Sequence, residues 1–136
     1  MPDSGLAPLQ VQLLEAVAAV TIAATEETAL FSAPWNGTLQ TVEYIADTAI
    51  TGANSNTRRV SLVNKGQAGA GVTEMAALQF DAGVNAVAFD AKAITNSATP
   101  ANLAFVAGDV LTWKSAAVGS GLADPGGTVV LRIGRD

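Results

Sequence analysis

Apolar and polar residues alternate along much of this chain with the period of two that β-strands produce. The clearest example is residues 58–64, where Val60 and Leu62 share one face and Arg59, Ser61 and Val63 share the other. Residues 72–80 alternate again, and the glycine-rich residues 65–71 between the two segments supply turns and flexibility. These residues predict two antiparallel strands joined by a long exposed loop.

The same alternation predicts further strands between turn signals that contain glycine, proline or asparagine. About eight short antiparallel strands in one chain are typical of two facing sheets. We therefore predict an all-β fold, an antiparallel jelly-roll-like β-sandwich of about eight strands. The strands expected in addition to the central pair are residues 16–24, 27–32, 38–47, 84–94, 103–106, 108–115 and 128–133.

The N-terminal residues predict an extended arm, because the first eight include two prolines and a glycine. We expect residues 1–14 to form this arm and residues 15–136 to form one β-sandwich domain. The apolar side chains of Leu6, Leu9, Val11 and Leu13 need burial. They either belong to a strand or short helix on the chain's own core, or dock onto a neighbouring subunit.

The composition fits a single domain with a thin core. The chain has 136 residues and is rich in alanine, with only four Phe, two Trp and one Tyr. Its net charge is −5, and Arg58 and Arg59 form the only adjacent basic pair. We therefore expect no nucleic acid partner. The apolar residues 16–24 are too few to span a bilayer, so no membrane partner is expected.

Candidate chemistry is limited by the absence of histidine and cysteine. The common zinc and non-haem iron ligand sets, the Ser-His-Asp triad and the Cys-His dyad are therefore excluded. Acidic residues remain, but most fall beside turns or at strand ends, where turn geometry accounts for them. We expect no enzyme activity, no catalytic residue, no cofactor and no bound metal.

Large and charged side chains mark the candidate interaction residues. Trp35 and Trp113 could form a platform for stacking on a sugar, or they could pack in the core or against a subunit. Arg58 and Arg59 must point to opposite faces of their strand, so at least one could meet an acidic group across an interface. The candidate interaction residues are Leu6, Leu9, Val11, Leu13, Trp35 and Arg58.

Four segments give the chain a family resemblance: residues 31–39 (FSAPWNGTL), 59–66 (RVSLVNKG), 107–111 (AGDVL) and 121–127 (GLADPGG). In this arrangement the chain resembles the small capsid decoration, or cement, proteins of tailed bacteriophages. The resemblance implies a virion structural protein, made in the host cytoplasm, that binds the major capsid protein on the outer capsid surface. It also implies a homo-oligomer, with a trimer expected, that stabilises the shell.

Other classes of function remain as alternatives. A receptor- or carbohydrate-binding module of a head fibre or tail adhesin would use a similar β-domain, because fold alone does not decide function. Under the decoration hypothesis, we expect the β-domain to oligomerise through a side face. The arm would then lie on the capsid lattice.

Overall fold

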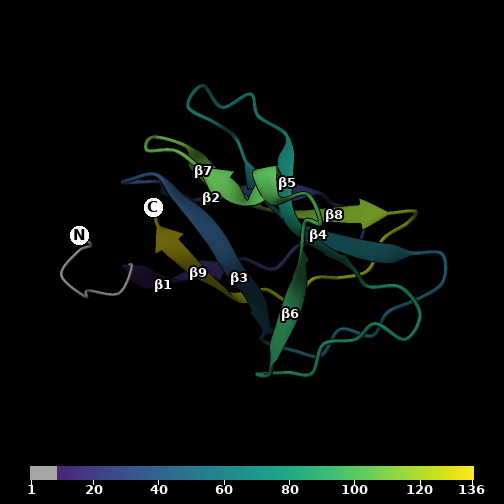
Figure 1. The fold of residues 1–136 in the computed structure, drawn as a ribbon. Coiled ribbons are helices and arrows are strands. Elements are labelled where there is room, and N and C mark those ends of the chain that lie inside the picture. The colour runs from purple at the N-terminus through teal and green to yellow at the C-terminus, as the bar shows by residue number, and fades with distance from the viewer. Residues whose placement is uncertain (1–8) are drawn as a thin grey trace.

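The computed structural model describes residues 9–136, which contain nine β-strands and one short 3₁₀ helix (Figure 1). Most of the polypeptide is extended, so the predicted all-β class is confirmed. The elements are β1 (Gln10–Val17), β2 (Glu26–Ser32), β3 (Gly37–Ala46), β4 (Thr57–Asn64), β5 (Thr73–Gln79), β6 (Ala91–Asn96), η1 (Pro100–Leu103), β7 (Ala104–Phe105), β8 (Val110–Val118) and β9 (Gly127–Arg135).

The strands form two antiparallel layers. One layer has the order β1-β9-β3-β6, and we call it the β1 sheet; the short strand β7 pairs with the start of β3. The other has the order β2-β8-β4-β5, and we call it the β2 sheet. Only the two residue pairs Ala76↔Asn96 and Ala77↔Thr95 join β5 to β6 and connect the layers. This order is that of a jelly roll, so the predicted fold is also confirmed.

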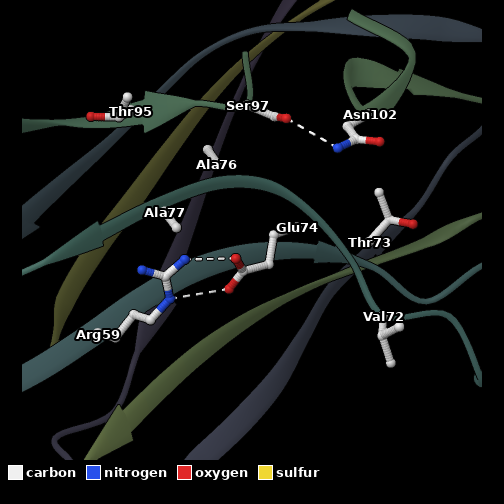
Figure 2. A pocket seen from close by; sticks show the side chains of 9 residues that line it. All are labelled: Arg59, Val72, Thr73, Glu74, Ala76, Ala77, Thr95, Ser97 and Asn102. Atoms are coloured by element: carbon white, nitrogen blue, oxygen red, sulfur yellow. Dashed lines mark hydrogen bonds and ion pairs between the residues drawn. The ribbon is translucent and has the colours of Figure 1, made fainter. Parts of the chain in front are cut away.

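The central strand pair of the sequence analysis is present as β4 and β5, in antiparallel register from Arg59↔Gln79 to Asn64↔Thr73. Arg59 and Glu74 project together from the outer face of this pair (Figure 2). β4 also pairs with β8 along its other edge, and Ser61 and Val63 are buried as well as Val60 and Leu62 on the opposite face. A central strand is covered more completely than its own pattern indicates.

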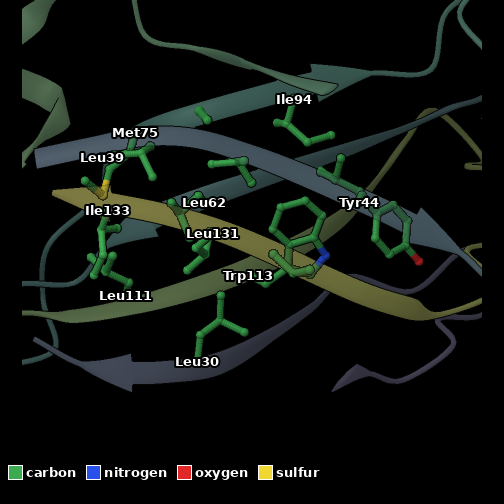
Figure 3. Packing of buried hydrophobic residues seen from close by; sticks show 14 of the residues in the cluster. Leu30, Leu39, Tyr44, Leu62, Met75, Ile94, Leu111, Trp113, Leu131 and Ile133 are labelled. Carbon is green, nitrogen blue, oxygen red and sulfur yellow. The ribbon is translucent and has the colours of Figure 1, made fainter. Parts of the chain in front are cut away.

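The core lies between the two sheets and draws large side chains from both (Figure 3). Tyr44 and Leu131 come from the β1 sheet, whereas Leu62, Leu111 and Trp113 come from the β2 sheet. The rings of Tyr44 and Trp113 lie with their centroids 5.5 Å apart at an angle of 46°. Such tilted aromatic pairs stabilise a core beyond the area that they bury.

Three β-bulges change which side chains reach this core. The pairing shifts between Leu39 and Thr41, so Gln40 is an extra residue in β3, and similar shifts occur at Leu30 in β2 and Met75 in β5. An extra residue reverses the alternation on one side of the bulge. Leu39 and Val42 are therefore both buried, although strict alternation predicts opposite faces for them.

Two predicted strands have different bounds in the structure. Residues 84–90, predicted as the first half of a strand, form turns and a bridge, and β6 begins only at Ala91. Residues 18–25, predicted mostly as strand, form the connection between β1 and β2. Both segments have β-like composition. They lack a continuous partner strand, and pairing rather than composition decides whether a strand forms.

The predicted arm is also corrected. Gln10–Val17 forms β1 and pairs with β9 along its whole length, from Gln10↔Gly134 to Val17↔Gly127. The predicted boundary between residues 14 and 15 therefore falls inside a strand, and residues 10–14 belong to the domain. Residues 1–8, which include Leu6, lie outside the described residues.

Candidate functional site

Four loops meet at one end of the sandwich, and we call this the four-loop end. They join β1 to β2, β3 to β4, β5 to β6, and β8 to β9. Bridges connect them in pairs: Val20↔Asp124 links the first to the last, and Ile50↔Ala86 links the second to the third. Because each loop is hydrogen-bonded to another, the end has a defined surface.

Phe89 protrudes from this end on a strained backbone. Its φ angle is +61°, and it is the one non-glycine residue with positive φ in the described part of the chain. The backbone N–H of Phe89 donates to the carbonyl of Ala46 at 2.9 Å, which fixes the strained conformation. Phe89 is 77% exposed, and Val87, two residues earlier, is 64% exposed. The fold therefore holds an apolar projection in solvent.

This arrangement is unfavourable within the isolated chain. A left-handed conformation costs a bulky residue roughly 1–2 kcal/mol. An exposed phenylalanine also forgoes about 1.5–3 kcal/mol that burial would provide. The hydrogen bond to Ala46 offsets part of the strain, but the side chain stays in solvent. Strain combined with exposure makes Phe89 a candidate interaction residue.

Beneath the four-loop end lies a buried polar cluster centred on Asp124. The Tyr44 hydroxyl donates to one carboxylate oxygen at 2.5 Å, and the Ser115 hydroxyl donates to the other at 2.6 Å. The backbone N–H of Gly126 donates a third hydrogen bond at 3.0 Å. Burial, followed by the hydrogen bond to Asp124, raises the pKa of Tyr44 far above its usual range. The carboxylate therefore acts as an internal anchor for the loop between β8 and β9.

Arg58 completes this cluster and is fully buried, with none of its surface exposed. Its guanidinium donates to the carbonyls of Leu122 and Ala24 at 2.8 Å each, and to those of Thr21 and Ile22 at 3.0 and 3.1 Å. The interaction role predicted for Arg58 is therefore wrong. Its five fixed donors join two loops to the β2 sheet, and it is inaccessible to a partner.

The two tryptophans do not form a stacking platform, which was one of the two interpretations of these residues. Trp113 lies in the core and is only 2% exposed. Trp35 is half-buried and lies at the opposite end of the sandwich from the four-loop end. The centroid of its ring is 6.0 Å from that of Phe105. The sugar-stacking alternative is corrected on this point, because a stacking platform needs exposed ring faces. Core packing, the other interpretation, holds for Trp113.

A depression with a volume of about 460 Å³ lies where the outer face of the β4–β5 pair meets the end of β6 and η1 (Figure 2). Ala76 and Ala77 lie along it, while Thr95, Ser97 and Asn102 contribute polar groups. Its charged residues already satisfy each other: Arg59 binds Glu74 at 2.7 Å, and this hydrogen bond lowers the pKa of the carboxyl group. The depression offers polar contacts but neither a free charge nor an aromatic face.

The remaining predicted interaction residues lie along β1. Val11 and Leu13 are partly buried and pack against the core, which supports the first-strand interpretation of this segment. Leu9 is exposed next to the first pair of β1 and β9. Sequence reasoning missed Phe89 and Val87, which it placed in a strand. It also missed Leu14, whose side chain is 60% exposed.

Within residues 9–136, no helix is long and apolar enough to cross a membrane. The same residues contain no group of three acidic side chains arranged to hold a metal ion. Fold and surface together define a jelly-roll domain with an interlocked loop end and an exposed apolar projection. The chain matches no known family model, no curated protein and no solved structure.

Proposed function

We propose that this protein is a virion structural protein that decorates the outer surface of a phage capsid and stabilises the shell. The observation that supports this function best is Phe89, an exposed aromatic residue on a strained backbone that a hydrogen bond to Ala46 fixes in place. A decoration protein acts by adhesion. A pre-organised apolar projection suits that task, because little conformational freedom is lost when it binds.

The charges around Phe89 indicate what kind of surface it contacts. Asp90 follows it directly, and Asp47 follows Ala46, the residue that binds its backbone. The chain as a whole carries a net charge of −5. The partner surface, in this proposal the major capsid protein, therefore presents an apolar pocket with basic residues at its rim. Many such contacts on one shell add through multivalency.

Self-association on the shell is part of the proposal, with the trimer implied by the family resemblance as its expected form. A capsid lattice offers repeated, symmetric sites, and neighbouring copies gain from contact with one another. The location that follows is the capsid surface of the virion.

The experiment is co-sedimentation with capsids of the phage that encodes the protein, using Phe89→Gly. Glycine adopts a positive φ without strain. We therefore expect the variant to keep the loop and to match the wild-type free energy of unfolding within about 1 kcal/mol. We expect its capsid affinity to fall at least about tenfold, which is equivalent to about 1.4 kcal/mol. The matched control is Val72→Ser, because Val72 is 81% exposed at the opposite end of the sandwich.

Two results would contradict the proposed attachment surface: normal binding by Phe89→Gly, or an equal loss with Val72→Ser. Deletion of residues 1–8 measures the contribution of these residues separately. We choose this deletion because removing residues 1–14 would also remove most of β1. Absence of wild-type binding to these capsids would refute the decoration function itself.

A further inference from the structure

Among residues 9–136, the strand order ends on β1 and on β2, and each of these strands leaves one edge unpaired. These edges differ in their protection against pairing with another strand. In β2, Glu26 and Glu27 add two charges, and a bulge at Leu30 distorts the strand. Charges and bulges are the usual means by which natural sheets block edge pairing. The β2 edge is therefore protected.

The β1 edge is less protected than the β2 edge. Its eight residues, QVQLLEAV, contain one charge, Glu15, and no lysine or proline. Its register with β9 is continuous over all eight pairs, so the strand is free of bulges. On its outer face Leu14 is 60% exposed. A regular, nearly uncharged edge with an exposed leucine is suited to pairing with a further strand.

The hydrogen-bond pattern shows which backbone groups face this edge. The backbone N–H of Arg135 donates to the carbonyl of Leu9 at 2.8 Å, which makes these two a hydrogen-bonded pair. In an antiparallel ladder such pairs alternate, so every second residue of β1 directs its N–H and C=O toward β9. The residues between them direct theirs outward, and these are Gln10, Gln12, Leu14 and Ala16.

We propose that β1 pairs antiparallel with β1 of a second copy of this chain, about a two-fold axis at Leu14. In this register the outward groups of Leu14 meet those of Leu14 in the other copy, and Gln12 meets Ala16. The two β1 sheets become one continuous sheet across the axis. The inference goes beyond the proposed function and does not depend on it.

Charge and side-chain complementarity favour a second copy as the occupant. The protein carries a net charge of −5, so most of its surfaces repel an identical chain. Along β1 the one charge, Glu15, lies opposite Leu13 of the other copy, and no like charges face each other directly. On the outer face, leucine packs on leucine, as favourable cross-strand pairs do.

A two-fold contact joins two chains and leaves no equivalent site for a third. Any trimer must therefore form through a different surface, and β1 would then join two trimers. The two assemblies are thus compatible, and each can be tested without the other.

The first test uses the fact that the chain contains no cysteine. A single Leu14→Cys substitution places two thiols on directly opposed residues, which a short bifunctional maleimide can span. We expect a covalent dimer from purified Leu14→Cys protein, but not from Ala29→Cys. Ala29 is the matched control because it is an exposed residue on the β2 edge.

The second test measures self-association by sedimentation equilibrium. We expect Leu14→Lys to weaken the dimer at least about tenfold, because two ammonium groups would face each other at the axis. Ala29→Lys should leave it unchanged. Gln12→Pro is a second variant: it removes an outward N–H and leaves the pairing with β9 intact.

Any of three outcomes would overturn the proposal. The first is a wild-type chain that stays monomeric at concentrations on the order of 100 μM. The second is a dimerisation step that neither Leu14→Lys nor Gln12→Pro weakens, which would place the two-fold contact elsewhere. The third is cross-linking that is as efficient through position 29 as through position 14. None of these measurements uses capsids, so they leave the proposed function untouched.

Discussion

Two neighbouring arginines show how strongly position governs the role of a residue. Arg58 is fully buried and binds four carbonyls, whereas Arg59 lies on the outer face and binds Glu74. A buried guanidinium whose hydrogen bonds are all internal stabilises the loops that it holds. An exposed ion pair contributes little, because water and salt screen it.

We predict that Arg58→Ala destabilises the protein by about 3–5 kcal/mol, since it removes the donor to four loop carbonyls and leaves the buried Asp124 without its neighbouring positive charge. Arg59→Ala, the matched control at the next residue, should cost at most about 1 kcal/mol. Urea unfolding monitored by tryptophan fluorescence measures both. Equal losses for the two variants would show that Arg58 is not an internal anchor.

Tyr44 makes a second prediction at this scale, concerning pH. Burial and the hydrogen bond to Asp124 raise its pKa above the ordinary value of 10.0. The folded state therefore holds the phenolic proton more tightly than the unfolded state. This contribution to the free energy of unfolding is fully present below pH 10.0 and is lost as the pH rises further.

Because Tyr44 is the single tyrosine, tyrosinate absorbance reports on it alone. We expect no tyrosinate until alkali unfolds the protein. Tyr44→Phe should cost about 1.5–3 kcal/mol at neutral pH, as loss of a hydrogen bond to a charged group does. The variant should also lack part of the alkaline decline in stability. Ionisation near pH 10.0 in the folded protein would contradict this account.

At the scale of elements, the bulges decide which face of a strand is buried. In β3, the extra residue Gln40 allows both Leu39 and Val42 to reach the core. Without it, a period of two would direct one of them into solvent. The register of β3 is therefore set by its backbone pairing with β9. The side chain of Gln40 itself has a minor role.

We predict that deletion of Gln40 destabilises the domain by about 2–5 kcal/mol, comparable to losing a buried leucine. Gln40→Ala preserves the backbone count and should cost far less, since the side chain is exposed. Chemical denaturation of the two variants separates the effect of the bulge from that of the glutamine. Equal midpoints would show that β3 tolerates a register without the bulge.

At the scale of the whole molecule, the first and last strands of the chain lie side by side in one sheet. β1 pairs with β9, so residues 10–17 join residues 127–134 in one ladder. Val129, Leu131 and Ile133 of β9 are buried, and β1 covers one flank of that strand. Removal of β1 would expose both the backbone of β9 and the adjoining core.

We therefore predict that a chain lacking residues 1–17 does not fold, whereas a chain lacking residues 1–8 unfolds at the wild-type midpoint, within about 0.5 kcal/mol. Circular dichroism and thermal unfolding distinguish the two outcomes. A folded chain without β1 would mean that the remaining strands form a sufficient core. It would also remove the edge on which the proposed dimer depends.

The sequence by itself determined the fold class and most of the strands. Alternation and turn residues act locally, so residues 58–64 and 72–80 could be recognised as a hairpin without knowledge of the rest. The absence of histidine and cysteine likewise excluded whole classes of chemistry from composition alone.

Only the tertiary structure decided which residues are accessible. The local patterns around Arg58 and Arg59 are the same, and their different burial depends on loops that are distant in sequence. Phe89 resembled a strand residue until the missing partner strand and its positive φ showed a loop. The free edge of β1 also depends on which strands are neighbours. Burial and pairing are long-range properties, and a local pattern does not contain them.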